Sequence, residues 1–446
     1  MLIKTVLPFT DFLWILQKDE YENLRYLYWL KRFYFRRNFV VTEKLVYTLR
    51  TKITLSAAIL LWIVSLIAML VITTGIISIL LILALWFLLI PLFVGLANFL
   101  FVPLFALGHY RERTRATRIV REHKPMQIIA VVGSYGKTTT KHFLYDLLRF
   151  NYRTQMIPGT INTTSGIAAW VPRELRTETE VLIVEMDSYH KGGIAQSAAI
   201  TPPDFAIITS IGEQHMQRFG NQATLVATLG EIITLAKPNT IIIGDKKTLE
   251  YVGHLQNGKT FVEVDTSHLA YAGAKLHTDE LSQSNKENLA RALEIASRLS
   301  VPLSFVEDTV LHLQLPDRRQ KVTDVYGYEG IDDSYNISLS TARAGLAAAR
   351  SLAGARKKKL LVIAAGIPEL GPDELDGNQK LGASIAAVAD HTIVFNSMFV
   401  SEIILGLGDT RYTLYKKTPS FLIDTKVFPK EEWVVLLEPK LPDLYY

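Results

Sequence analysis

The longest apolar segment of the chain lies near its N-terminus. From Ile53 to Gly108, 56 consecutive residues include no Asp, Glu, Lys or Arg. Because a helix of about 20 apolar residues can cross the hydrocarbon core of a membrane, the segment predicts two membrane-spanning helices, at about 54–73 and 76–94, joined by a turn at Thr73-Thr74-Gly75. A buried hairpin in a soluble core is the alternative, but core helices of this length normally carry a polar stripe. The charged and aromatic residues before the segment argue against a cleaved signal peptide.

After residue 124 the pattern changes to short apolar runs that alternate with helical stretches. Strands are predicted at the apolar runs, 128–132, 181–186, 205–211, 240–244, 322–328, 360–364 and 392–396. The clearest helices lie at 285–299, 339–353 and 378–389. Strands that alternate with helices predict parallel α/β sheets. We therefore divide the chain into a membrane module, residues 1–124, a central domain, 125–314, and a smaller C-terminal domain, 315–446.

Basic residues cluster on both sides of the apolar segment. Residues 1–52 carry ten Lys or Arg against five Asp or Glu, and residues 108–124 carry six against two. The remaining residues hold 32 basic and 36 acidic side chains, so the formal charge of +5 comes from the two flanks. By the positive-inside rule, both flanks, both termini and the α/β domains are expected on the cytoplasmic side of the plasma membrane. This position favours anionic lipid headgroups over nucleic acid as the partner of the basic residues.

The sequence contains no cysteine. Disulfides, zinc–thiolate sites and a cysteine nucleophile are therefore excluded. The chemistry of the chain must come from other residue types.

A glycine-rich segment follows the first predicted strand. Residues 133–140 read Gly-Ser-Tyr-Gly-Lys-Thr-Thr-Thr and lead into a predicted helix. Such a loop directs backbone N–H groups and a helix N-terminus toward a phosphate, while Lys137 adds a positive charge and the Thr138 hydroxyl reaches Mg²⁺. Val131 stands where the usual P-loop pattern has its first glycine, so a helix-capping turn with a surface lysine is the alternative. The segment predicts binding of ATP or GTP with Mg²⁺.

The spacing of this loop, G-x-x-G-K-T-T-T, resembles that of the Mur ligase family, the ATP-dependent enzymes that add amino acids to peptidoglycan precursors. Seven further segments resemble motifs of the family and follow the family's order along the chain. Residues 162–166 resemble its substrate-side loop, 184–186 its acidic strand end, 209–215 its T-N-I-x-x-x-H motif and 285–288 its H-N-x-x-N motif. Residues 316–318 resemble its P-G-R motif, 331–336 its D-D-S-Y-N motif and 368–371 its E-L-G motif. The last two point to the branch that adds D-alanyl-D-alanine to the muramoyl tripeptide. The resemblance covers about residues 126–395. It implies an α/β fold, with a P-loop central domain built on a parallel sheet and a smaller Rossmann-like C-terminal α/β domain, here preceded by a two-helix transmembrane hairpin.

The resemblance also implies roles for individual residues. The residues expected to surround the phosphates of ATP are Gly133, Ser134, Tyr135, Gly136, Lys137, Thr138 and Thr139. The expected Mg²⁺ ligands are Thr138, Glu185 and His215. Asn288 and Arg318 would contact adenine and the γ-phosphate, and Asp333 the ribose. The catalytic groups of the implied reaction are Lys137, Glu185, His215 and Arg318. In that reaction the γ-phosphoryl group passes to a carboxylate and an amine then attacks the acyl phosphate, so the protein must neutralise and align concentrated negative charge.

The chain departs from the family pattern at several positions. Leu229 precedes Gly230-Glu231-Ile232, where the family usually has a lysine whose carbamylated form bridges to Mg²⁺. Ser210 replaces a usual asparagine, and the segment 437–440 lacks the family's K-G-S-R run. We interpret Asp187, where a small residue is common, as an exposed loop residue, with a compensating metal ligand as the alternative. Either a second metal ion is held differently here, or ligase activity is weakened or lost.

The membrane module stands in place of the family's N-terminal domain, which binds the UDP moiety. Because an anchor raises the effective concentration of substrates in the bilayer, we expect a lipid-linked or membrane-proximal peptide acceptor, with a small amino acid or dipeptide as donor. The leading hypothesis is thus an ATP-dependent amide ligase of peptidoglycan precursor synthesis. The alternatives are a membrane-bound ligase for another polymer, such as poly-γ-glutamate, and a degenerate nucleotide-binding scaffold for cell-wall enzymes.

Overall fold

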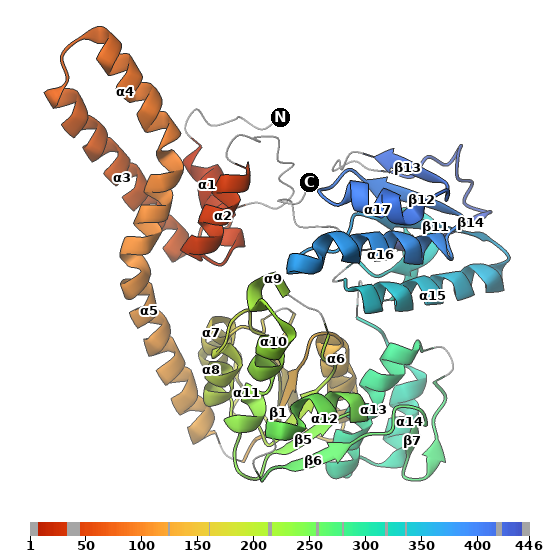
Figure 1. The fold of residues 1–446 in the computed structure, drawn as a ribbon. Coiled ribbons are helices and arrows are strands. Elements are labelled where there is room, and N and C mark those ends of the chain that lie inside the picture. Colours follow the sequence, from red (N-terminus) through yellow and green to blue (C-terminus); the bar gives the residue numbers. More distant parts are fainter. Residues whose placement is uncertain are drawn as a thin grey trace. The chain divides into compact units, whose positions relative to one another are not determined.

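The computed structural model of the chain contains two compact units, Met1–Arg111 and Glu112–Tyr446 (Figure 1). The first is helical, and the second holds two α/β domains. The residues that the structure describes are 8–33, 45–123, 125–159, 161–212, 216–255, 258–278, 281–316, 320–334, 337–415 and 422–438.

The first unit is built from helices around the apolar segment. They are α1 Phe9–Lys18, α2 Asn23–Phe33, α3 Leu49–Ile72, α4 Ile76–Leu88 and the first part of α5 Ile90–Glu122. Helix α3 begins after Thr48, whose side chain accepts a hydrogen bond from the backbone of Thr51. It ends at the predicted turn, where Gly75 adopts a φ of 105° that favours glycine.

The second long apolar helix does not lie where the sequence placed it. Instead of one helix at 76–94, the chain forms the short α4 and then begins α5 at Ile90. Pro91 explains the break, because proline lacks a backbone N–H and is favoured in the first turn of a helix, where that N–H would have no partner. Among the described residues, two helices, α3 and α5, are long and apolar enough to cross a membrane by length and composition.

The central domain contains a parallel sheet with the strand order β2-β3-β1-β4-β5-β6. Its strands are β1 Gln127–Val132, β2 Thr154–Met156, β3 Val181–Glu185, β4 Phe205–Ile208, β5 Ile241–Gly244 and β6 Thr260–Glu263. The helices of this domain are α6 Lys137–Leu148, α7 Thr164–Glu174, α8 Gly193–Ile200, α9 Met216–Phe219, α10 Gln222–Leu229, α11 Glu231–Thr234, α12 Lys246–Val252, η1 Gly253–Leu255, α13 Gln283–Arg298 and α14 Leu303–Leu311. A two-stranded ribbon, β7 Ala270–Tyr271 and β8 Ala274–Lys275, precedes α13.

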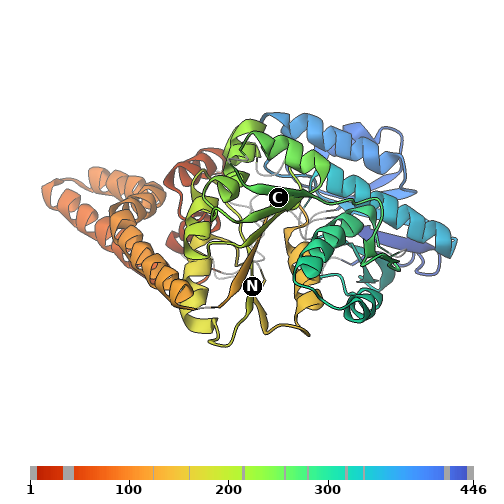
Figure 2. The same cartoon turned by 90° about the horizontal axis from the view of Figure 1, so that it is seen from below.

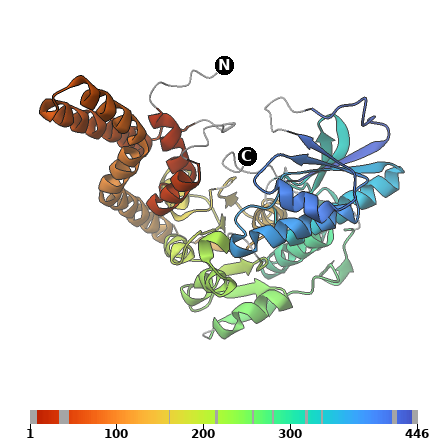
Figure 3. The ribbon, with the colours of Figure 1, turned by 45° about the horizontal axis from the view of Figure 1, so that its top comes forward.

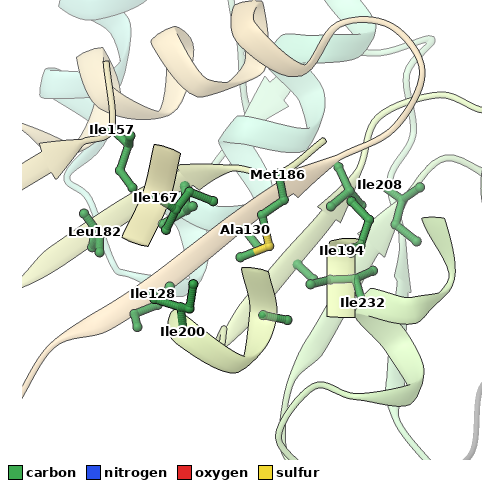
Figure 4. Close-up of a cluster of buried hydrophobic side chains, with 14 of the residues drawn as sticks. Ile128, Ala130, Ile157, Ile167, Leu182, Met186, Ile194, Ile200, Ile208 and Ile232 are labelled. Carbon is green, nitrogen blue, oxygen red and sulfur yellow. The ribbon is translucent and has the colours of Figure 1, made fainter. Parts of the chain in front are cut away.

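Helices cover both faces of this sheet (Figures 1 and 2). Alternate residues of β1 point to opposite sides. Ile128 and Ala130 pack against α7, α8 and α11 in the cluster of Figure 4, and Ile129 and Val131 pack against α6 and α13. Burial on both faces explains why β1 reads as a continuous apolar run rather than as an alternating one.

The C-terminal domain contains a mixed sheet with the order β13-β12-β11-β14-β10-β9. Its strands are β9 Lys321–Val325, β10 Tyr328–Asp332, β11 Lys359–Ala364, β12 His391–Phe395, β13 Tyr412–Tyr415 and β14 Trp433–Leu437. Its helices are α15 Leu339–Arg356, η2 Gly371–Asp373, α16 Glu374–Ala386 and α17 Val400–Leu407, coloured cyan to blue in Figure 3. Strand β9 is antiparallel to β10, and the other pairs are parallel.

Two details of this domain differ from the sequence prediction. The predicted strand 322–328 is a hairpin, because Tyr326 and Gly327 both take positive φ values and reverse the chain. Strand β14, which inserts between β10 and β11, was not predicted.

Candidate functional site

The glycine-rich loop joins β1 to α6 at the carboxyl edge of the central sheet. Gly133 and Gly136 have φ values of 138° and 84°, which favour glycine. A Cβ at Gly133 would lie 2.2 Å from the Thr209 hydroxyl oxygen, and one at Gly136 would lie 2.3 Å from Oδ1 of Asn288. Both glycines are thus required by conformation and by space. The loop has the form that directs backbone amides and a helix N-terminus at an anion.

The segment after β4 holds this loop in place. The backbone N–H of Ser134 donates to the Ser210 carbonyl at 2.7 Å, and the N–H of Tyr135 donates to the Ser210 hydroxyl at 3.1 Å. The Ser134 hydroxyl donates to the carbonyl of Gly212 at 3.1 Å, and the Thr209 hydroxyl donates to the Tyr135 carbonyl at 2.5 Å. Ser210, which departs from the family pattern, is therefore one of the residues that fix the loop.

Lys137 lies inside the loop rather than on the surface. Its ammonium donates to the carbonyl oxygens of Gly133 and Ser134 at 2.6 and 3.2 Å, and it pairs with Asp187 Oδ2 at 3.1 Å. The reading of the loop as a capping turn with a surface lysine is thereby wrong. A cation held by the carbonyls of a phosphate loop is placed to move onto a phosphate group.

Asp187 is not an exposed loop residue, so the interpretation from the sequence is wrong. Its side chain is 11% exposed and faces Lys137, and its backbone N–H donates to the Asn162 carbonyl at 2.9 Å. These contacts place a second carboxylate beside the phosphate loop.

Glu185, the last residue of β3, is the centre of a buried polar network. Its Oε2 accepts from the Thr138 hydroxyl at 2.8 Å and pairs with Lys141 Nζ at 3.0 Å, while its Oε1 accepts from Asn162 Nδ2 at 3.1 Å. Lys141 also donates to the Gly159 carbonyl at 2.9 Å. The structure thus brings the predicted residues Thr138 and Glu185 together, and it adds Lys141 and Asn162 as direct partners. Lys141 was not predicted.

The charge of Glu185 is stabilised by its surroundings. Burial by itself would raise the pKa of this carboxyl, but the charges of Lys141 and Lys137, with hydrogen bonds from Asn162 and Lys141, hold it below its usual 4.5. Because the pKa of Glu185 is lower in the folded than in the unfolded chain, its ionised form adds to the free energy of unfolding. This contribution is complete above the unfolded-state pKa, and it is lost as the pH falls through the folded-state pKa.

We therefore expect the free energy of unfolding of the wild-type chain to fall more steeply than that of Glu185→Gln as the pH drops below 4.5. Urea unfolding followed by tryptophan fluorescence between pH 7 and pH 3 measures this. Parallel curves for the two proteins over this range would contradict the assignment of an ionised Glu185.

Asn288 lies beside the phosphate loop, next to Gly136. Its Oδ1 accepts from the Thr140 hydroxyl at 3.3 Å and from Arg291 Nη1 at 3.5 Å. Arg291 is buried and forms an ion pair with Asp245, the residue that caps α12. These contacts place Asn288, the residue expected at adenine, beside the loop.

Three predicted residues of the site, Asp333, His215 and Arg318, are not placed at the phosphate loop by the described part of the structure. Asp333 is buried at the end of β10, in the C-terminal domain, and its Oδ2 accepts from Gln320 at 3.4 Å. His215 and Arg318 lie outside the described residues. Their roles as metal ligand and phosphate contact stay predictions.

Leu229 lies in an apolar core and not among the polar residues of the phosphate loop. It is 4% exposed and packs with Phe219 and Leu225 in a small apolar core. The next acidic residue, Glu231, accepts hydrogen bonds from the backbone of Gly192 and Ala195 at 2.5 and 3.0 Å, at the N-terminus of α8. This segment therefore stabilises the fold.

We expect Leu229→Lys to destabilise the protein by about 2–5 kcal/mol, because it removes apolar packing and buries a charge. Leu235→Lys is the matched control, since Leu235 is exposed and such substitutions cost under about 0.5 kcal/mol. Thermal unfolding compares the two. A stable Leu229→Lys protein whose activity rose with bicarbonate would instead place residue 229 at the metal.

The donor set of the site suits a hard cation. The Thr138 hydroxyl, the Glu185 carboxylate and Asp187 are oxygen ligands of the kind that Mg²⁺ prefers, and Mg²⁺ usually binds through one or two carboxylates together with phosphates. Within the described ranges, no three His, Asp or Glu side chains form a metal-binding group. The site thus fits a Mg²⁺ ion that arrives with a nucleotide.

Three comparisons agree with this geometry. Residues 131–303 match the model of the Mur ligase middle domain. The UDP-N-acetylmuramoyl-tripeptide–D-alanyl-D-alanine ligase of Bacillus subtilis is 28% identical over 279 residues, 58% of this chain and 60% of that protein. The same ligase of Escherichia coli is 23% identical over 294 residues, 60% of this chain and 64% of that protein. The solved structure of MurF ligase from Thermotoga maritima in complex with ADP has a TM-score of 0.62 and 22% identity, and covers 74% of this chain and 80% of that one.

The chain thus spans less than two thirds of the length of these curated relatives. The structural likeness shows the fold, a parallel-sheet central domain followed by a mixed C-terminal sheet, and confirms the predicted α/β class.

Proposed function

We propose that this protein is an ATP-dependent amide ligase. The proposal starts from the match of residues 131–303 to the Mur ligase middle domain and from the similarity of the chain to muramoyl-tripeptide–D-alanyl-D-alanine ligases. The observation that carries the proposal is the cluster of Thr138, Lys141 and Glu185 next to Lys137 at the carboxyl edge of the central sheet. In open α/β sheets this edge is where ligands bind.

The reaction joins a carboxylate and an amine at the expense of ATP. The γ-phosphoryl group passes to the acceptor carboxylate, which gives ADP and an acyl phosphate. The amine then attacks the acyl carbon, inorganic phosphate leaves and the amide forms. Mg²⁺, when bound, neutralises charge on the phosphate oxygens.

The residues of the loop would bind and orient the nucleotide. The backbone amides of residues 133–137 and the N-terminus of α6 would face the phosphates. Lys137 would leave the carbonyls of Gly133 and Ser134 for the β- and γ-phosphates, and Asp187 would release it. Lys141 would keep Glu185 ionised and oriented toward Thr138. Asn288, with its Oδ1 engaged by the protein, would present its amide N–H₂ to an acceptor on the base.

The proposed amine substrate is D-alanyl-D-alanine or a similar small amino acid or dipeptide, by homology with the ligases named above. The proposed acceptor is a muramoyl peptide that is lipid-linked or close to the membrane, because an anchored enzyme meets such substrates at high effective concentration.

A phosphate-release assay on the purified full-length chain tests the activity. ADP formation should require both a muramoyl tripeptide and D-alanyl-D-alanine, and a lipid-linked tripeptide should be used better than the soluble UDP-linked form. Equal use of the two acceptors would remove the lipid part of the proposal. No peptide-dependent ADP formation from any pair would overturn the ligase and favour the scaffold.

We also propose that α3 and α5 anchor the protein in the plasma membrane, with the α/β domains in the cytoplasm. Both helices are long and apolar enough to span a bilayer, and basic residues flank them. We expect the full-length chain to stay in the membrane pellet after an alkaline carbonate wash and to enter solution with detergent. Release by carbonate alone would contradict the anchor.

A further inference from the structure

Asn288, the residue proposed to contact the nucleotide base, has a buried arginine as its neighbour on α13. Arg291 follows Asn288 by three residues, so one turn of the helix brings the two side chains to the same face. The Arg291 side chain is only 2% exposed, and arginine is almost never buried to this extent without a charged partner. The chain thus places a full positive charge inside the central domain, next to the residue proposed to read the base.

Asp245 holds Arg291 in one position. It is the residue directly after β5, so it lies at the same carboxyl edge of the sheet as the phosphate loop. Its Oδ2 forms an ion pair with Arg291 Nη2, and its two carboxyl oxygens accept hydrogen bonds from Thr248 at 2.8 and 3.0 Å. Burial by itself would raise the pKa of the Asp245 carboxyl, but the hydrogen bonds from Thr248 and the charge of Arg291 hold it below its usual 3.8. The pair is therefore ionised and fixed at this edge.

The guanidinium of Arg291 determines which end of the Asn288 carboxamide faces it. A guanidinium carries only N–H donors, whereas a carboxamide has an acceptor at Oδ1 and donors at Nδ2. Arg291 Nη1 lies 3.5 Å from Asn288 Oδ1, and the Thr140 hydroxyl lies 3.3 Å from the same oxygen. Turning the carboxamide over would bring its N–H₂ group against the donors of Arg291, which is unfavourable. The N–H₂ group is therefore directed away from Arg291, where it can donate to a ligand.

We propose that Arg291, held by Asp245, is a positioning residue that fixes the Asn288 carboxamide so that its N–H₂ group donates to a ring nitrogen of the nucleotide base. The inference rests on the proposed binding of ATP at the phosphate loop, and it adds what selects the base. An unprotonated ring nitrogen of a purine accepts a hydrogen bond, whereas the exocyclic amino group of adenine is a donor and would be repelled by a second donor. The site should therefore recognise the acceptor at one position of the ring.

Binding of ATP and of its 1-deaza, 3-deaza and 7-deaza analogues to the full-length chain in detergent tests the inference. Each analogue replaces one ring nitrogen with a C–H group and leaves the triphosphate unchanged. We expect one analogue to bind the wild type about tenfold more weakly than ATP, the usual loss for one hydrogen bond to a buried donor. Asn288→Ala should bind ATP and this analogue with equal affinity. Isothermal titration calorimetry in the presence of Mg²⁺ measures the ratio of the two affinities.

Arg291→Lys should reduce this ratio to below about threefold. The lysine keeps a positive charge for Asp245, but a single ammonium does not reproduce the fork that contacts both Asp245 and Asn288. The double variant Arg291→Met/Asp245→Asn removes the charge pair and should have the same effect on the ratio. Arg298→Lys is the matched control, because Arg298 ends α13, pairs with Glu294 and is partly exposed. Its ratio should stay that of the wild type.

A purely structural role for Arg291 would give a different result. Loss of packing or stability would weaken ATP and the analogue together, and an unchanged ratio in both Arg291 variants would overturn the inference. Circular dichroism and urea unfolding show whether each variant is folded. A wild type that bound all three analogues as tightly as ATP would also overturn the inference, while the proposed ligase would stand. A wild type that bound no ATP would overturn the proposed function and the inference with it.

Discussion

Lys137→Ala should lower substrate-dependent ADP formation by about a hundredfold to a thousandfold, the loss typical of removing one preorganised group that stabilises transition-state charge. Lys137 belongs to the phosphate loop, where its ammonium contacts two loop carbonyls and Asp187. Without it, the charge that builds up on the transferring phosphoryl group has no fixed counterion in the loop. A coupled assay for ADP at saturating acceptor and amine measures the loss.

Lys247→Ala is the matched control for this prediction. Lys247 lies on the exposed surface of α12, and its removal should change neither the rate nor the nucleotide affinity. If Lys137→Ala retained wild-type binding of ATP and wild-type ADP formation, the loop would not be the nucleotide site and the proposed function would fail.

The phosphate loop could be predicted because its parts are adjacent in the sequence. Gly133, Gly136 and Lys137 follow a strand and precede a helix, so the local order of residues determines the local geometry. Glu185 could be placed through family resemblance and because parallel strands end at a common edge, which brings residues from distant segments together.

Residues that depend on side-chain direction were harder to predict. Lys141 is four residues after Lys137 on α6, so the helix period places the two on one face, and that signal could have identified it. Asp187 lies in a loop, where the sequence does not determine whether a carboxylate faces solvent or the site. Pro91 could have predicted the break between α4 and α5, but the continuous apolar run around it favoured a single helix.

Strand order limited the prediction of the C-terminal domain. Glu438 is far from Asp333 in the sequence, and the two meet because β14 inserts between β10 and β11. A sequence pattern shows that strands exist, but it does not show which strands are neighbours.

Lys141→Met should lower the free energy of unfolding by about 3–5 kcal/mol, the usual cost of removing one partner of a buried ion pair. The side chains of Lys141 and Glu185 are 0% and 3% exposed, and their charged atoms are 3.0 Å apart. Without the lysine, Glu185 keeps its hydrogen bonds from Thr138 and Asn162 but loses its nearest opposite charge. Urea unfolding of the purified chain measures the difference.

The double variant Lys141→Met/Glu185→Gln separates the ion pair from packing. If the cost of Lys141→Met arises from an uncompensated buried carboxylate, neutralising Glu185 should restore most of the lost stability, because a buried pair replaced by neutral groups is often no less stable. If the cost arises instead from the lost packing of the lysine stem and its bond to the Gly159 carbonyl, the double variant should be as unstable as Lys141→Met. The first outcome would mean that Lys141 acts mainly to keep Glu185 ionised beside Thr138, as the proposed Mg²⁺ site requires. In that case Lys141→Met should also weaken Mg²⁺-dependent ATP binding more than Mg²⁺-free binding.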